Sequence, residues 1–129
     1  MSHKRKGSNA ERELVRFFWE RGWATLRAAG SGSQQYPCPD VLAGKNGRRL
    51  AIECKMTSSQ KKYLSLQELN ELQYFANTFG AEAWIGVRFH RENWFFLQLE
   101  DIPLTAKHGV ISLELAKLKG LTIQELTEW

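Results

Sequence analysis

An Asn-Gly pair at residues 46–47 lies between two largely apolar segments, and it is the sequence feature that most restricts the fold. Asn and Gly adopt positive φ at low cost, so this pair is preferred in the two-residue turn of a β-hairpin. The segments 40–44 and 49–56 are therefore predicted to be antiparallel strands. This turn pairs the residues next to it first and, continuing outward along the strands, places Asp40 opposite Glu53.

Asp40, Glu53 and Lys55 should then share one face of the hairpin, with opposed Cβ atoms about 5 Å apart. Two carboxylates at this distance repel each other, and a divalent cation bound between them removes the repulsion. Mg²⁺ typically takes one or two protein carboxylates and leaves positions for water and phosphate oxygens, and Mn²⁺ accepts similar ligands. We therefore predict that Asp40 and Glu53 bind Mg²⁺, or Mn²⁺ in its place, with the Ile52 backbone carbonyl as a further ligand. Beside such a metal, Lys55 could orient or deprotonate an attacking water, or neutralise charge in the transition state.

A first helix is predicted from Asn9 to Arg21, because Ser8-Asn9-Ala10-Glu11 has the spacing of a capping box. Glu11 lies near the middle of the apolar arc of this helix. A carboxylate there is costly unless its oxygens are used, so Glu11 should cap its own helix, face a buried polar site, or do both. The alternative for the whole cluster is structural, with Asp40 in a turn and Glu53 and Lys55 in an exposed ion pair.

The remaining pattern predicts an α/β domain with a central mixed five-stranded sheet flanked by helices. Further strands are expected at 23–29, 83–89 and 94–99. A second capping box at 65–68 begins a helix that should end at Gly80, and the Gly-, Ser- and Pro-rich segment 30–39 should be a loop. The expected order is helix, three strands, helix, two strands and a short helical tail, with a short helix at 113–118 and a capped turn at 122–125. We divide this single domain into a basic arm (1–8), a catalytic core (9–99) and a C-terminal extension (100–129).

The chain has 129 residues with 43% hydrophobic content, which suits one domain. No apolar run approaches the roughly 20 residues of a membrane helix, and the N-terminus has no apolar signal core. We therefore expect a cytoplasmic protein that has no membrane partner. Cys38 and Cys54 are expected to be free thiols, since a chain of this apolar content needs no disulfide.

The net charge of +4 favours an anionic partner, and several basic residues cluster along the chain. Lys4, Arg5 and Lys6 form the predicted arm, and Lys61 and Lys62 are expected in a loop. These side chains are predicted to contact DNA, although a solubilising surface is the alternative for each cluster. The chain has more aromatic residues than one small core readily buries. Some of them are therefore candidates for an apolar interface, with ordinary core as the alternative: Phe75, Trp94, Phe96 and Trp129.

Pro39-Asp40, twelve intervening residues and Glu53-Cys54-Lys55 resemble the signature of the PD-(D/E)xK nuclease superfamily. Further blocks are similar to the archaeal Holliday junction resolvases, over residues 5 to about 99. These blocks are Ala10-Glu11-Arg12-Glu13-Leu14, Arg27-Ala28-Ala29-Gly30-Ser31-Gly32-Ser33, Pro39-Asp40-Val41-Leu42-Ala43-Gly44 and Ile52-Glu53-Cys54-Lys55.

The resemblance implies a restriction-endonuclease-like fold and a homodimeric, Mg²⁺-dependent endonuclease that cuts four-way DNA junctions by paired symmetric nicks. It implies that Asp40 and Glu53 hold the metal and that Lys55 is catalytic. Glu11 would be the upstream acidic residue of the site, which also makes it a candidate ligand. The implied residues at the DNA-facing edge are Arg12, Arg27 and one serine, for which Ser31 and Ser33 both qualify.

A dimer is also expected on physical grounds, because a junction has approximate two-fold symmetry and must be cut twice. Two other functions remain open at the level of sequence: a duplex-cutting or repair endonuclease of the same superfamily, and a non-catalytic DNA-structure-binding protein. We expect the protein to associate with the nucleoid. Proteins of the recombination or replication machinery are further candidate partners, and no motif identifies which.

Overall fold

The structure is a computed structural model that describes the backbone of residues 3–128 and the side chains of residues 7–31 and 33–128. Its centre is the predicted hairpin, formed by β2 (Val41–Lys45) and β3 (Arg48–Thr57). Asn46 and Gly47 make the turn with φ of 49° and 87°, and Lys45 pairs with Arg48. The pairing continues to Val41 opposite Ile52, so the predicted register is confirmed.

The hairpin belongs to a five-stranded sheet with the order β1-β2-β3-β5-β6. β1 (Ala24–Arg27) is antiparallel to β2, β5 (Glu82–Phe89) is parallel to β3, and β6 (Trp94–Gln98) is antiparallel to β5. The predicted mixed five-stranded sheet is therefore confirmed. Because only β3 and β5 run parallel, the connection between them must cross over the sheet, and it carries a helix.

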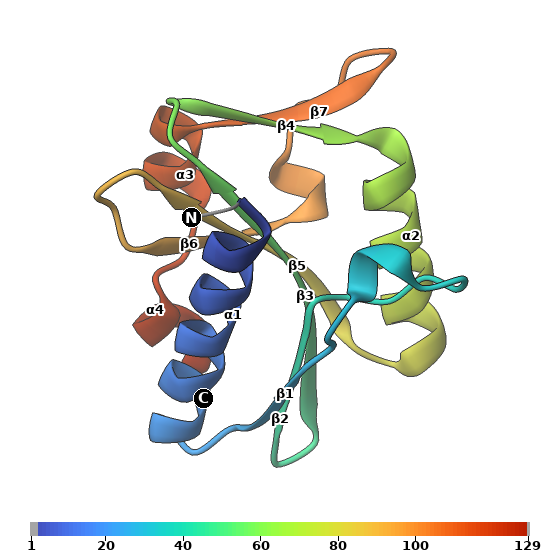
Figure 1. Cartoon of the computed structure of the whole chain (residues 1–129), viewed down its shortest axis with the longest axis vertical. Helices are drawn as coiled ribbons and strands as arrows, with labels where there is room; N and C mark the ends of the chain where they lie inside the picture. Colours follow the sequence, from blue (N-terminus) through green and yellow to red (C-terminus); the bar gives the residue numbers. More distant parts are fainter. Residues whose placement is uncertain (1–2, 129) are drawn as a thin grey trace.

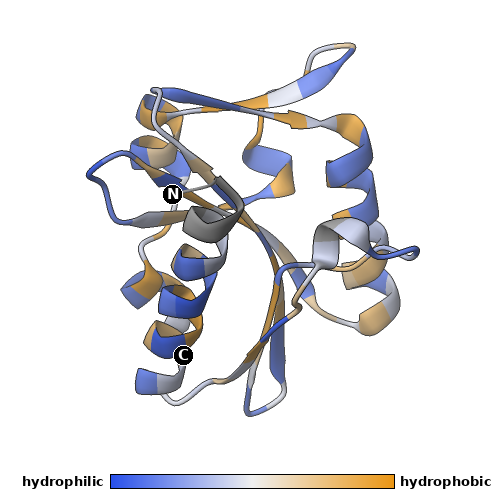
Figure 2. Cartoon of the chain, in the orientation of Figure 1, coloured by the Kyte–Doolittle hydropathy of each residue, from blue (hydrophilic) through white to orange (hydrophobic). Residues whose placement is uncertain are grey.

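Helices cover both faces of this sheet (Figure 1). α1 (His3–Glu20) packs on one face through Leu14 and Phe18, which are fully buried with Ile52 and Phe96. On the other face, α2 (Leu66–Phe79) buries Leu69, Leu72 and Ala76 against β3 and β5. Figure 2 shows apolar residues along the central strands and mixed polar and apolar residues on the helices. β3 thus lies between two cores, and its side chains alternate between them.

The ends of α2 are as predicted. The Ser65 hydroxyl accepts a hydrogen bond from the backbone amide of Glu68, and the Glu68 carboxylate accepts one from the backbone amide of Ser65. Gly80 ends the helix with φ of 85°. Cys38 and Cys54 are both free, as predicted.

The predicted start of the first helix is wrong, because α1 begins at His3 and not after a cap at Ser8. Lys4, Arg5 and Lys6 therefore lie in the first turns of α1 instead of an arm that precedes the helix. The Ser8 hydroxyl accepts a hydrogen bond from Arg27 Nη2, a residue of β1. Ser8 and Glu11 have the spacing of a capping box, but their side chains bind Arg27 of β1 and do not cap the start of a helix.

A two-stranded sheet was not predicted. β4 (Lys61–Ser65) pairs antiparallel with β7 (His108–Ser112), so the expected loop at Lys61 and Lys62 is wrong. β4 runs directly into the cap of α2, and its partner is more than forty residues away in the segment with the weakest sequence signals. Neither strand shows a hairpin turn that could have identified the pair.

The C-terminal segment packs on the domain. It contains η2 (Leu99–Asp101), β7, α3 (Leu113–Lys119) and α4 (Ile123–Thr127), and α4 has the predicted capping box. Ile111, Ala116 and Leu126 are fully buried in the two cores. Among residues 3–128, no helix is both long enough and apolar enough to cross a membrane.

Two of the residues considered for an apolar interface are core residues. Trp94 and Phe96 stack with ring centroids 6.2 Å apart, and Phe96 is fully buried. Phe75 is half-buried and packs against the α2 side of the core. The remaining candidate, Trp129, lies outside the described residues.

Candidate active site

Asp40 lies immediately before β2 and is one of the few buried polar residues, with 7% of its surface exposed. Its backbone amide donates to the Ile52 carbonyl at 3.0 Å, which extends the hairpin pairing by one bond. One carboxylate oxygen accepts the Cys54 amide at 2.8 Å, and the other accepts the Ser31 hydroxyl. The carboxylate is therefore fixed on both sides by the chain itself.

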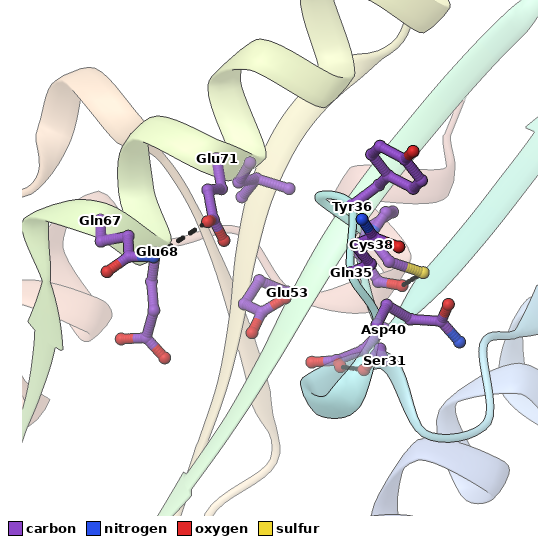
Figure 3. A pocket seen from close by; sticks show the side chains of 12 residues that line it. Ser31, Gln35, Tyr36, Cys38, Asp40, Glu53, Gln67, Glu68 and Glu71 are labelled. Carbon is purple, nitrogen blue, oxygen red and sulfur yellow. Dashed lines mark hydrogen bonds between the residues drawn. The ribbon is translucent and has the colours of Figure 1, made fainter.

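Glu53 points from β3 toward α2, into the same hollow as Asp40 (Figure 3). The pKa of Glu53 is raised to about 8, mainly by burial and then by the neighbouring charge of Asp40. Lys55 acts in the opposite direction, with its ammonium 3.8 Å from a Glu53 oxygen. The predicted juxtaposition of two carboxylates and a lysine on one face of the hairpin is present.

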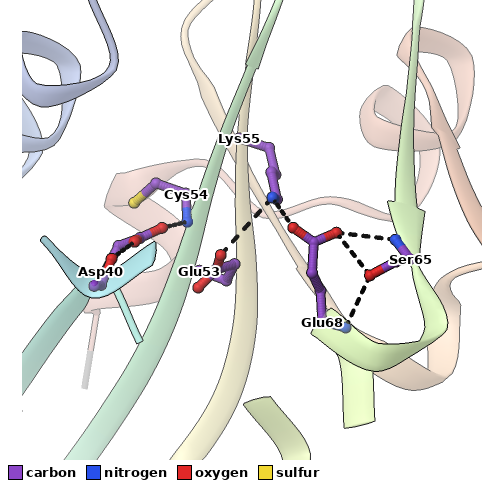
Figure 4. A network of polar contacts seen from close by, with 7 residues as sticks. Asp40, Glu53, Cys54, Lys55, Ser65 and Glu68 are labelled. Carbon is purple, nitrogen blue, oxygen red and sulfur yellow. Dashed lines mark hydrogen bonds and ion pairs between the residues drawn. The ribbon is translucent and has the colours of Figure 1, made fainter. Parts of the chain in front are cut away.

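Lys55 is held by Glu68, the capping residue of α2 (Figure 4). Burial favours the neutral amine, but the hydrogen bond and charge of Glu68, with the charges of Glu53 and Asp40, raise the pKa of Lys55. Burial also favours the protonated form of Glu68, yet the bonds from Lys55 and Ser65 lower its pKa. Lys55 is therefore held as a cation. The sequence identified Glu68 only as a cap, because its contact with Lys55 depends on how α2 packs against β3.

Glu11 does not cap its helix, and it forms an ion pair with Arg27 at 3.0 Å. Burial raises the pKa of Glu11, as does Asp40, while Arg27 lowers it. Glu11 lines a hollow on the α1 side of β3, together with Cys54, whereas Asp40 and Glu53 line the hollow on the α2 side. The structure thus brings Glu11 within electrostatic range of Asp40 but leaves its carboxylate paired with an arginine.

The two candidate serines differ in position. Ser31, in η1 (Ser31–Ser33), contacts Asp40, whereas Ser33 is exposed and donates to the Gly30 carbonyl at 3.0 Å. The geometry therefore brings Ser31 to the acidic cluster and leaves Ser33 at the surface.

The predicted DNA-contact residues are spread over several elements. Arg12 is exposed on α1 and donates a hydrogen bond to Asn9. Arg27 donates hydrogen bonds to Glu11 and Ser8. Lys61 is exposed and Lys62 is half-buried on β4. The side chains of Lys4, Arg5 and Lys6 lie outside the described residues.

The donor set suits a hard divalent cation in part. Asp40 and Glu53 supply two carboxylates, and one lone pair of the Ile52 carbonyl already accepts the Asp40 amide. Among the residues with described side chains, no three His, Cys, Asp or Glu groups are arranged to hold a metal. One or two carboxylates are the usual protein share of a Mg²⁺ site, and burial together with the charge of Asp40 raises the pKa of Glu53 there. The residues present therefore fit a cation that keeps most of its positions for water and phosphate.

The mixed sheet and the Asp40, Glu53 and Lys55 cluster on its central hairpin define the chain as a nuclease with a restriction-endonuclease-like fold. A family model described as archaeal Holliday junction resolvase (Hjc) matches residues 2–129. The chain belongs to this family.

Individual proteins agree with the family assignment. The crossover junction endodeoxyribonuclease Hjc of Archaeoglobus fulgidus is 39% identical over 129 residues, which cover 95% of either chain. The Hjc of Methanocaldococcus jannaschii is 38% identical over 96 residues, covering 74% of this chain and 68% of that protein. The solved structure of A. fulgidus Hjc, a Holliday junction resolvase, matches with a TM-score of 0.86 and covers 92% of this chain and 95% of that one.

Proposed function

We propose that this protein is a crossover junction endodeoxyribonuclease that acts on four-way DNA junctions in the nucleoid and makes paired, symmetric nicks. The observation that carries the proposal is the Asp40, Glu53 and Lys55 cluster, in a chain that belongs to the Hjc family. The names of the relatives, crossover junction endodeoxyribonucleases, support the choice of substrate over plain duplex DNA.

Asp40 and Glu53 are the residues that would hold Mg²⁺, or Mn²⁺ in its place. When bound, the ion would polarise the scissile phosphate and make water a better nucleophile. We assign Glu11 the role of positioning Arg27 at the DNA-facing edge, because the two side chains are ion-paired 3.0 Å apart. This role is favoured over that of a further metal ligand, because the Glu11 carboxylate is already paired with Arg27.

Lys55 contributes as a cation in this proposal. Its raised pKa keeps the ammonium protonated at neutral pH, so it supplies positive charge where negative charge grows on the phosphate. A protonated lysine is a poor base, and this favours charge neutralisation over deprotonation of the water. Ser31 supports the site by donating to Asp40.

A cleavage assay on an immobile four-way junction and its matching linear duplex tests the proposal. We expect symmetric nicks in the junction with Mg²⁺ and no product with EDTA. Equal cutting of the duplex would instead indicate a general or repair endonuclease. Salt-sensitive binding that is indifferent to EDTA and never yields product would indicate a non-catalytic junction-binding protein.

We further propose that the protein acts as a homodimer through an apolar surface beside β1. This surface consists of Trp19, Leu26 and Phe79, which are 56%, 55% and 50% exposed, and it lines a hollow of about 460 Å³. The Trp19 indole donates to the Thr25 carbonyl at 2.9 Å, so the ring is fixed in an exposed position. A second copy is the natural occupant, since two sites related by a two-fold axis match a substrate that is cut twice.

Phe79→Arg is expected to dissociate this dimer, because a charge within an apolar interface must be desolvated. We expect the dimer dissociation constant, measured by analytical ultracentrifugation, to rise about thirtyfold or more, which is the effect of a hot-spot residue. Leu118→Arg is the matched control, since Leu118 is 78% exposed on α3 and outside this surface. A dimer that tolerates Phe79→Arg as well as Leu118→Arg would exclude this interface.

A further inference from the structure

A second hollow lies on the α1 side of β3 and encloses about 670 Å³. It begins at Glu11 and Cys54, and the backbone amide of Cys54 donates to the Asp40 carboxylate. From there it runs past Thr57 and Ser58 to the turn between β5 and β6. We call this hollow the α1-side groove, and it starts beside the candidate active site.

The two hollows carry opposite charge. Among the described side chains, the hollow on the α2 side is lined by no Lys or Arg and by four carboxylates, those of Asp40, Glu53, Glu68 and Glu71. The α1-side groove is lined by three Lys or Arg residues and by a single carboxylate, that of Glu11. A DNA strand that brings a phosphate to Asp40 and Glu53 is repelled by the first hollow and attracted by the second.

The cations of the groove are available to a ligand. Arg88 is paired with Glu13 at 2.8 Å, but no ion pair or hydrogen bond joins Lys62 or Arg91 to another described side chain. Arg91 is exposed, and Lys62 is half-buried on β4. Unpaired cations that line a groove are the usual means by which proteins hold a nucleic-acid backbone.

Arg91 also has an uncommon backbone conformation. Its φ of 61° lies in the left-handed region, in the turn closed by the Glu92 amide and the Phe89 carbonyl. Gly or Asn adopts this conformation at lower cost than Arg. Backbone strain of this kind is concentrated at functional sites, which supports a role for the Arg91 side chain.

Trp94 forms part of the wall of the groove. It is 3% exposed, and its indole nitrogen is a buried donor that no described residue accepts. Such a donor lowers stability unless it is satisfied.

From these observations we infer that the α1-side groove binds backbone phosphates of the DNA arm that flanks the scissile bond, through Arg91 and Lys62. This inference rests on the proposed function, from which it takes junction DNA as the substrate. It predicts recognition of backbone charge, not of base sequence, because Arg91 and Lys62 are cations that suit phosphate oxygens.

The test uses the full-length protein, a four-way junction and Arg91→Asn. Asn tolerates the left-handed turn, so the thermal midpoint of unfolding should stay the same or rise, while the Kd for the junction should rise about three- to tenfold. The slope of log K against log salt should fall by about 1, as for one lost phosphate contact. Lys62→Ala should weaken binding similarly, and the control Lys119→Ala, at the end of α3, should not.

Arg91→Lys separates charge from structure, since it keeps the cation and the unfavourable φ. We expect its Kd to remain within about twofold of the wild-type value. Wild-type affinity and salt slope in Arg91→Asn would overturn the inference, as would an equally weak Arg91→Lys. A wild-type protein that binds junctions through these residues but never cuts them would refute only the proposed catalytic function.

Discussion

Glu53→Gln is expected to reduce junction cleavage by about a thousandfold or more while leaving junction binding intact or tighter. The substitution keeps the shape of the side chain and removes one of the two carboxylates that would hold the metal. Loss of one group that stabilises developing charge costs about 10²–10³ in rate, and loss of a ligand adds to this. Binding should not suffer, because a carboxylate repels the phosphate backbone. The measurement is single-turnover cleavage of a labelled junction with Mg²⁺, together with a binding titration in EDTA.

Glu71→Gln is the matched control for this experiment. Glu71 lines the same hollow and accepts a hydrogen bond from Gln67 at 3.1 Å, but no hydrogen bond or ion pair joins it to Lys55 or Asp40. We expect its cleavage rate to stay within a few-fold of the wild-type rate. Asp40→Asn should behave as Glu53→Gln does. Near-normal turnover in Glu53→Gln would exclude the assigned site.

The hairpin shows why much of this site is predictable from sequence. Asn46 and Gly47 fix the turn, the turn fixes the register, and the register places Asp40 beside Glu53. Each step is local, so it needs no knowledge of the rest of the fold. The second helix is predictable for the same reason, since its cap at Ser65 and its end at Gly80 depend on neighbouring residues.

The contacts that complete the site depend on tertiary packing instead. Glu68 reaches Lys55 only because α2 packs on the face of β3 from which Lys55 projects. Arg27 reaches Glu11 across the contact between β1 and α1. Sequence spacing alone therefore predicts that both glutamates cap the start of a helix. This prediction is confirmed for Glu68 and wrong for Glu11.

β4 and β7 mark a second limit of sequence reasoning. Their pairing joins Lys61 to Ser112 across a long separation, without a turn that fixes the register. The basic residues of β4 were therefore expected in a loop. Their position on a strand directs Lys62 to the α1-side groove, which no local pattern could indicate.

The stability of the metal-free protein is expected to fall as the pH rises from about 4.5 to about 8, because of Glu53. Its folded pKa of about 8 lies above the ordinary value of 4.5, so the folded state retains a proton that the unfolded chain has lost. Stability decreases with pH wherever the folded state binds more protons. At about 1.36 kcal/mol for each pH unit, the loss from this group is roughly 3–5 kcal/mol, and it is complete above pH 8.

Urea denaturation in EDTA at about pH 5.5 and pH 8.5 measures this effect, and Glu53→Gln assigns it. The variant has no titrating carboxyl at this position, so its free energy of unfolding should change less between the two pH values. Glu11, whose pKa is also raised, should leave a smaller decline in the variant. Mg²⁺ should stabilise the wild-type protein at the higher pH and have little effect on Glu53→Gln, because a cation binds the ionised carboxylate and offsets its repulsion from Asp40. An equal pH dependence in both proteins would show that Glu53 is ionised without penalty, and the electrostatic argument for a metal at this site would then fail.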